Sequence, residues 1–189
     1  MIIDTHTHFY DPARPQGVPW PPKDDALLYR PVLPTDFRRL ALPEGVTGTI
    51  VVEASPWLED NQWILDLAAD EPMIVGLVGH LDPDAPDFVA NLRRFAGNRL
   101  FRGIRCGGQL FDPERPLSTP QAQRLRAHLE QLAALDLELD VLLSKQHLPA
   151  LCALARDLPE LRIVVNHIAH VPVDGGPPDP EWVDGMHRA

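Results

Sequence analysis

Short apolar segments alternate with helical segments along this chain. Six runs rich in β-branched and aliphatic residues have the length of buried strands, at 2–9, 48–54, 73–81, 101–107, 138–143 and 162–168. Between most of them, apolar residues recur at helical spacing, over 36–42, 61–69, 87–96, 121–135 and 147–158. We expect Thr35, Asp60 and the Thr119-Pro120 pair to begin three of these helices. The alternation predicts an α/β fold whose parallel sheet is buried on both faces.

The spacing of the strands favours a closed barrel. The strands start about 32 residues apart on average, so eight such units would reach the roughly 250 residues of a (β/α)8 barrel. The 189 residues hold six units and finish in a helix-like segment, 181–189, that carries no stop signal. We therefore expect a single incomplete barrel domain over 1–189, with strands one to six present and strands seven and eight absent. A complete, open, doubly wound sheet is the alternative, although no Rossmann-type glycine fingerprint follows strand one.

Composition narrows the range of partners. A net charge of −10 argues against binding to nucleic acid or to an anionic membrane surface. No apolar run reaches the roughly 20 residues of a membrane-spanning helix, and the two cysteines form no C-x-x-C pair. These features favour a cytoplasmic protein that binds a small molecule.

The connection over 10–47 is long and rich in proline. At the carboxyl end of a barrel strand, such a stiff loop builds substrate contacts or a lid, and it can equally be a surface wrap. Trp20 and Trp57 are candidate pocket walls or ordinary packing residues.

His6 and His8 are the strongest candidates for chemistry. Side chains on a strand alternate between its faces, so Asp4, His6 and His8 point to one side at the end of the first strand. Two imidazoles placed there can hold a divalent metal or polarise a substrate oxygen. The alternative is a pair of partly buried, hydrogen-bonded structural histidines.

Ionisable residues also end the later strands, where barrel enzymes place their chemistry. His167 ends the sixth run and shares a face with apolar residues of that run, which favours a site role over a surface role. Glu53 can orient a histidine or bind a substrate hydroxyl, and Arg105 offers a planar fork for a carboxylate or lactone oxygen; an ion pair between the two is the structural alternative. Lys145 and His80 are weaker site candidates. We assign the other histidines to surface or helix positions: His128, His147, His170 and His187.

Four segments together resemble the amidohydrolase superfamily. They are DTHTHFYDP from Asp4, GTIVVEA from Gly48, FRGIR from Phe101 and LRIVVNH from Leu161. They look most like the lactonase-like branch of metal-dependent hydrolases in that superfamily. The resemblance implies a TIM (β/α)8-type barrel with His6, His8 and His167 in the catalytic site, where they would also be the ligands of any bound metal.

The chain departs from the superfamily pattern at three places. The resemblance implies that an aspartate at the end of strand eight activates the attacking water, and no residue of this sequence corresponds to it. Leu143-Ser144-Lys145 stands where strand five commonly ends in a histidine ligand. Arg105 stands where strand four offers a bridging lysine or glutamate. One divalent metal ion such as zinc and metal-independent chemistry are therefore both open.

We interpret the chain as part of a hydrolase that opens the ring of a sugar lactone or related cyclic ester by attack of an activated water. In this interpretation the three histidines named above are catalytic, and Glu53, Arg105 and Lys145 bind the substrate. A metal-dependent decarboxylase or amide hydrolase is the alternative within the superfamily. A truncated, non-catalytic ligand-binding fragment is the alternative of another class. Unpaired edges on strands one and six would let such a partial barrel associate as a homo-oligomer.

Overall fold

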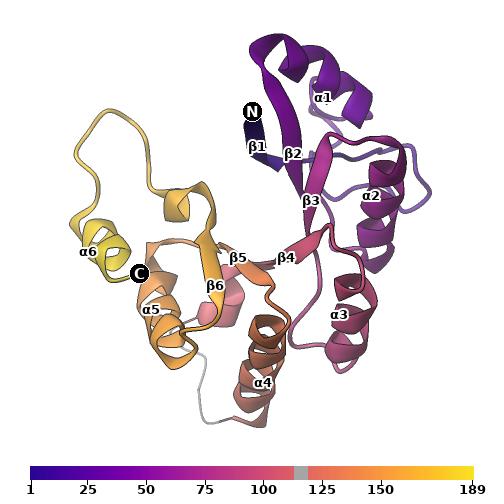
Figure 1. Ribbon diagram of the computed structural model, residues 1–189. Helices are drawn as coiled ribbons and strands as arrows, with labels where there is room; N and C mark the ends of the chain where they lie inside the picture. The colour runs from indigo at the N-terminus through magenta and orange to yellow at the C-terminus, as the bar shows by residue number, and fades with distance from the viewer. Residues whose placement is uncertain (113–118) are drawn as a thin grey trace. The chain divides into compact units, whose positions relative to one another are not determined.

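The computed structural model describes residues 1–112 and 119–189 (Figure 1). These residues form six strands, β1 (Ile2–Thr7), β2 (Val46–Val52), β3 (Ile74–Gly79), β4 (Phe101–Gly107), β5 (Glu138–Leu142) and β6 (Arg162–Val165). The strands belong to one sheet in the order β1-β2-β3-β4-β5-β6. The pairs β1–β2, β2–β3, β4–β5 and β5–β6 are parallel. A doubly wound sheet reverses its strand order at the switch point, so the sequential order confirms the barrel-type α/β prediction and not that alternative.

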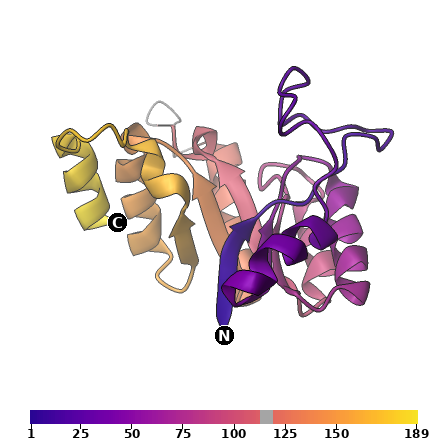
Figure 2. The ribbon, with the colours of Figure 1, turned by 90° about the horizontal axis from the view of Figure 1, so that it is seen from above.

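Helices connect the strands, as the alternating pattern predicts. They are α1 (Pro34–Ala41), α2 (Leu58–Asp70), α3 (Phe88–Ala96), α4 (Pro120–Ala134), α5 (Leu148–Asp157) and α6 (Pro180–Arg188). Short 3-10 segments follow four elements: η1 (Leu42–Glu44), η2 (Gly108–Phe111), η3 (Lys145–His147) and η4 (Asn166–His170). The long connection after β1 loops out from the strands and returns to α1 (Figure 2).

Of the three predicted helix caps, only Thr119 is confirmed. Its hydroxyl accepts a hydrogen bond from the Ala122 backbone N–H at 3.1 Å, and Pro120 opens α4. Thr35 is not a cap, because α1 begins at Pro34 and the Asp36 carboxylate accepts from the Leu33 N–H at 3.1 Å.

The prediction for Asp60 is also wrong. Helix α2 begins at Leu58, so Asp60 lies in its first turn. Its carboxylate accepts a hydrogen bond from the Ser55 hydroxyl and pairs with the Arg14 guanidinium at 2.7 Å. These tertiary partners hold the carboxylate away from the backbone N–H groups that a capping side chain would bind.

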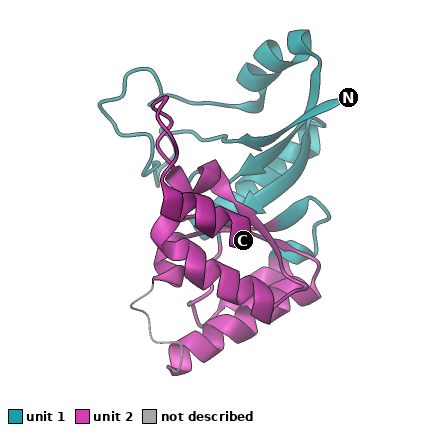
Figure 3. Ribbon diagram, turned by 90° about the vertical axis from the view of Figure 1, so that its left-hand side faces the viewer, with its two compact units in different colours: residues 1–80, 95–102 teal, residues 81–94, 103–189 magenta. Residues whose placement is uncertain are grey.

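Two compact units make up the chain (Figure 3). The first holds residues 1–80 and 95–102, and its core includes the fully buried Val51 and Leu77. The second holds residues 81–94 and 103–189, and its core includes the fully buried Ile104 and Leu139. The single barrel domain over 1–189 therefore stays a prediction, and each unit is described below by itself.

Strand β6 ends earlier than the sequence predicts. It stops at Val165, because the backbone turns into the left-handed region at His167, Ile168, Ala169 and His170, with φ between 46° and 53°. His167 therefore lies on the turn η4, and not on the strand face shared by Ile163 and Val165.

Candidate functional site

His6 and His8 come together at the end of β1, in the first unit. Their ring centroids lie 5.1 Å apart with an edge-on interplanar angle of 79°. The His8 Nδ1 atom lies 2.9 Å from the Val52 carbonyl oxygen at the end of β2. Because a carbonyl oxygen only accepts, Nδ1 carries the proton of this bond, and the neutral ring has its lone pair on Nε2. Histidine ligands of metals show the same arrangement, with one ring nitrogen donating to a protein oxygen.

Buried polar contacts fix the ends of β2 and β3 in the same unit. Glu53 directly follows β2, and its backbone N–H donates to the Val78 carbonyl at 2.8 Å. The Asn61 side chain, which is 2% exposed, accepts from the His80 N–H at 2.9 Å and donates to the His80 carbonyl at 2.8 Å. Asn61 thus locks the backbone at which β3 passes into the following loop. The sequence prediction placed Asn61 only as a helix residue and missed this role.

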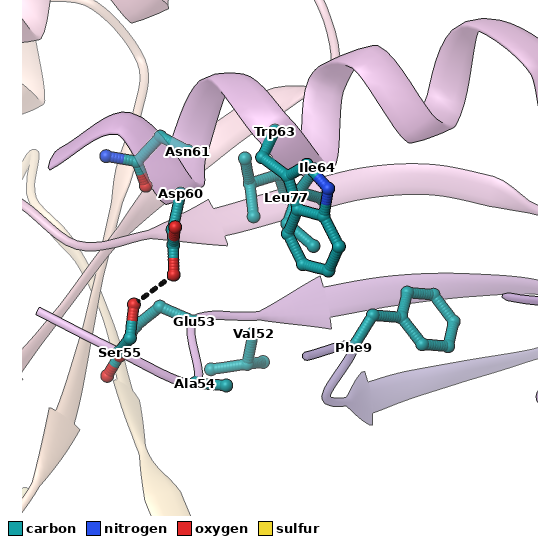
Figure 4. Close-up of a pocket in the computed structure, with 10 residues that line it drawn as sticks. All are labelled: Phe9, Val52, Glu53, Ala54, Ser55, Asp60, Asn61, Trp63, Ile64 and Leu77. Atoms are coloured by element: carbon teal, nitrogen blue, oxygen red, sulfur yellow. Dashed lines mark hydrogen bonds between the residues drawn. The ribbon is translucent and has the colours of Figure 1, made fainter. Parts of the chain in front are cut away.

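A small pocket lies between α2 and the segment that follows β2 (Figure 4). Its volume is about 10 Å³, which is near the minimum for one water molecule. Ser55 and Asp60 line it and are hydrogen-bonded to each other, as the dashed line in Figure 4 shows. The Arg14 guanidinium pairs with Asp60 and lies 4.2 Å from the centre of the Trp63 ring. The Arg14–Asp60 pair thus anchors the long connection at this pocket. The pocket itself is too small for a sugar-sized ligand.

Trp20 lies beside His8, and its role as a pocket wall stays a prediction. Tyr10 and Val32 form an antiparallel bridge that closes the connection on itself. The Trp20 ring lies 6.0 Å from the His8 ring and 6.1 Å from the Tyr10 ring, centre to centre. The Trp20 side chain is nevertheless 49% exposed, so much of its aromatic surface is open to a ligand.

In the second unit, Arg105 and Asp140 are paired in register on β4 and β5. Asp140 is 4% exposed and accepts a hydrogen bond from the Asn166 amide at 2.9 Å. Burial raises the pKa of Asp140, and the Asn166 hydrogen bond and the Arg105 charge lower it by less. Sequence reasoning missed both Asp140 and Asn166. The available signal was a carboxylate inside an otherwise apolar strand, which has to find a partner.

His167 is exposed on the turn η4, and His170 lies near it. The two ring centroids are 5.9 Å apart. The His170 Nδ1 atom donates to the Leu143 carbonyl oxygen at 2.9 Å, because that oxygen can only accept. His170 therefore has a specific partner at the end of β5, although the sequence prediction assigned it to the surface without one.

Lys145 forms ion pairs with two carboxylates at the start of α6. Its Nζ atom lies 2.5 Å from Asp179 and 3.0 Å from Glu181. Hydrogen bonds to these carboxylates raise the pKa of Lys145, and the bond to Lys145 lowers the pKa of Asp179. The structure thus gives Lys145 a role in holding α6, and its role in binding substrate stays a prediction.

The donor atoms of the first unit fit part of a metal site. The tautomer of His8 leaves a lone pair on Nε2, and the His6 ring lies next to it, with its Nε2 atom buried. Over residues 1–112 and 119–189, no group of three or more His, Cys, Asp or Glu side chains is placed to hold a metal ion. A metal bound by His6, His8 and His167 together therefore stays a prediction. Within the same residues no helix is long and apolar enough to cross a membrane.

Comparison with known proteins places this geometry in a family. A sequence model described as Amidohydrolase matches residues 3–189. An L-fucono-1,5-lactonase from Burkholderia ambifaria is 36% identical over 92% of this chain and 59% of its own length. A second protein of that name, from Burkholderia multivorans, is 30% identical over 81% of this chain and 51% of its own length. The chain therefore spans less than two thirds of the length of these relatives.

A solved structure shows the fold at the level of the backbone. A crystal structure of an amidohydrolase from Burkholderia multivorans with bound zinc superimposes with a TM-score of 0.80 at 25% identity. The match covers 100% of this chain and 65% of that one. Together with the histidine pair at the end of β1 and the sequential parallel sheet, these matches show that the chain belongs to the amidohydrolase family.

Proposed function

We propose that this protein contributes the first six strands of a hydrolase that opens the ring of a sugar lactone. The observation that carries the proposal is the His6–His8 pair, whose rings lie 5.1 Å apart at the end of β1. Support comes from two relatives named L-fucono-1,5-lactonase, of which one is 36% identical over 92% of the chain. The activity, substrate and partners of the whole protein are part of this proposal, because the chain covers only 59% of that relative.

In the proposed reaction, water adds to the lactone carbonyl carbon and the ring C–O bond breaks. The ring oxygen leaves as a hydroxyl, and the other product group is a carboxylate, so one proton is released at neutral pH. A base must take the proton of the attacking water, and we assign that role to the part of the barrel that follows β6. His6, His8 and His167 act on the carbonyl side of the reaction in this proposal.

The tautomer of His8 favours a metal ion as the group that acts on the carbonyl. A neutral ring whose Nδ1 donates to Val52 presents a lone pair at Nε2 and has no N–H there to donate to a carbonyl oxygen. A lone pair suits a divalent ion such as zinc, which would polarise the lactone carbonyl and lower the pKa of a bound water. His6 and His8 would hold that ion, with His167 as the proposed third ligand.

Three other side chains are proposed to recognise the sugar. Trp20 offers an exposed aromatic face beside His8, on which the apolar face of a sugar ring can stack. Glu53, at the end of β2, would bind a sugar hydroxyl. Arg105, on β4, would bind the lactone oxygens or a carboxylate, as would Lys145 if a ligand displaces it from Asp179.

A lactonase assay tests the proposal directly. A panel of sugar lactones is mixed with a pH indicator, and proton release is followed for the 189-residue chain and for an extended form. The extended form carries, after residue 189, the part of the Burkholderia ambifaria relative that the chain does not match. We expect activity in the extended form and loss of it in the same form with His8→Ala.

Two results would refute the proposal. The first is an extended form that folds and hydrolyses none of the lactones, with or without added zinc. The second is a His8→Ala variant as active as its parent. Ligand binding without turnover in the folded extended form would favour a binding protein instead.

A further inference from the structure

The turn after β6 has an unusual backbone. His167, Ile168, Ala169 and His170 have φ values of 49°, 46°, 53° and 53°. None of them is glycine, and residues with a Cβ atom normally visit the left-handed region one at a time, because the Cβ approaches the following carbonyl oxygen. Such a conformation persists only where the surrounding contacts over-determine it.

Three hydrogen bonds hold this turn to neighbouring elements of the second unit. The Asn166 amide donates to the Asp140 carboxylate on β5 at 2.9 Å. The His170 Nδ1 atom donates to the Leu143 carbonyl at 2.9 Å, and the Trp182 indole N–H on α6 donates to the Ile168 carbonyl at 2.8 Å. Only the first of the three is buried on both sides, since Asp140 and Asn166 are each 4% exposed.

The Asp140–Asn166 pair is unusual for a purely structural contact. The Oδ1 atoms of both residues are buried without a hydrogen-bond partner in the described part of the chain. Asp140 lies between Leu139 and Val141 on β5, and both of these are completely buried. A buried carboxylate with one hydrogen bond is costly compared with an apolar residue at the same place. A buried polar group kept at such a cost calls for a specific role.

We propose that Asp140 and Asn166 are positioning residues, whose buried hydrogen bond sets the start of the left-handed turn and so fixes where the His167 imidazole lies. The inference deepens the proposed function, on which it rests for the catalytic role of His167. Asn166 immediately precedes the turn, so a change in its side-chain direction is transmitted to the backbone of the next residue. Neither Asp140 nor Asn166 needs to touch the substrate.

Exchange of the two side chains tests this role. Asn166→Asp replaces the amide donor by a second carboxyl group at nearly unchanged volume, and it removes the hydrogen bond at a pH at which both carboxyl groups are ionised. The double variant Asp140→Asn with Asn166→Asp restores one donor and one acceptor in the reversed order. Asp136→Asn is the matched control, because Asp136 is 87% exposed in its side chain and pairs with Arg162 at the opposite ends of β5 and β6.

The first readout is the NMR spectrum of the 189-residue chain labelled with [13Cε1]histidine, with His167→Gln used to assign the His167 signal. We expect Asn166→Asp to shift or broaden that signal, the double variant to restore it, and Asp136→Asn to leave it unchanged. The second readout is kinetic, in the extended form. We expect Asn166→Asp to lower kcat by roughly 10- to 100-fold at nearly constant KM, as for other residues that orient a catalytic side chain, and the double variant to recover most of it.

A His167 signal that Asn166→Asp leaves unchanged in the folded chain overturns the proposal, even if the variant is less stable. So does a double variant that folds but does not restore the signal. If the extended form hydrolyses no lactone with any side chain at these positions, the proposed function fails. The NMR readout then still decides the positioning role, since it needs no turnover. Far-UV circular dichroism shows which variants are folded.

Discussion

Replacement of Asn61 should destabilise the first unit strongly, because its side chain makes two hydrogen bonds to the His80 backbone that water cannot fully replace. Asn61→Ala leaves the N–H and the carbonyl of His80 without their partners. Each buried group left without a partner costs about 1–3 kcal/mol, and the lower half of that range applies because His80 is only half-buried. The expected loss in the free energy of unfolding is therefore about 2–4 kcal/mol, which is roughly a 30- to 900-fold change in the unfolding equilibrium.

Urea unfolding followed by tryptophan fluorescence measures this loss. Three of the 4 tryptophans, Trp20, Trp57 and Trp63, belong to the first unit, so their emission reports mainly on it. Gln62→Ala is the matched control, because Gln62 is the next residue of the same helix and its side chain binds Asp66, four residues away, at 2.9 Å. Such a pair contributes about 0.5 kcal/mol or less.

Gly79 supplies a second perturbation of the same contact. A Cβ atom at residue 79 would collide with the Asn61 side-chain oxygen and with the Phe101 ring. We expect Gly79→Ala to destabilise the chain, and to cost less in an Asn61→Ala background, since one of the two collisions is then removed. An Asn61→Ala variant within about 0.5 kcal/mol of the parent, or equal to Gln62→Ala, would refute the argument that this contact fixes the end of β3.

Four further predictions concern the site and its surroundings. Dialysis of the extended form against a chelator should abolish lactonase activity, and zinc should restore it; full activity after metal removal would contradict the metal role of His8. Trp20→Ala should raise KM by about three- to tenfold with little change in kcat, whereas Leu27→Ala, at a 74% exposed residue of the same connection, should change neither. Asp140 has a raised pKa, so the native state holds its proton more tightly than the unfolded state, and the stability contributed by this group falls as pH rises from 3.8 through the raised value. Asp140→Asn should remove that dependence in urea titrations over the acidic range, and parallel pH profiles of parent and variant would sink the argument. Finally, Ile3 and Val164 are 41% and 42% exposed on β1 and β6, the first and last strands of the sheet. The 189-residue chain should therefore self-associate, and light scattering measures this association. Replacing both residues by lysine should reduce the association.

The regular elements could be predicted from the sequence because their signals are local. Strand β4 has the predicted bounds. The alternation of strands with helices correctly predicted an α/β fold with one parallel sheet. The caps show where local signals lose to tertiary contacts. The hydroxyl of Thr119 accepts from the Ala122 N–H and caps α4, whereas the carboxylate of Asp60 is held by Arg14 and Ser55.

From the sequence, the candidate site could be predicted only at residues that lie at the ends of the predicted strands. His6 and His8 were found by their alternation along β1, which is a property of neighbouring residues. Asn61 and Asp140 were missed, because their importance comes from partners 19 and 26 residues away, on other elements. No periodicity reports a buried hydrogen bond over that separation. The left-handed turn at His167 was missed for the same reason.

The histidines show why a tautomer alone does not identify a functional residue. His8, His128 and His170 all place Nδ1 within 2.9 Å of a backbone carbonyl, so all three rings carry a proton on Nδ1. His128 is 9% exposed and stacks on Phe88 with ring centres 5.0 Å apart, so the packed core leaves its ring no room for a ligand. His8 directly follows β1 and His170 lies on the turn η4, and each is next to a second imidazole. A backbone acceptor that fixes the ring is therefore common to all three histidines, and contact with a second imidazole is what distinguishes His8 and His170 from the histidine of the core.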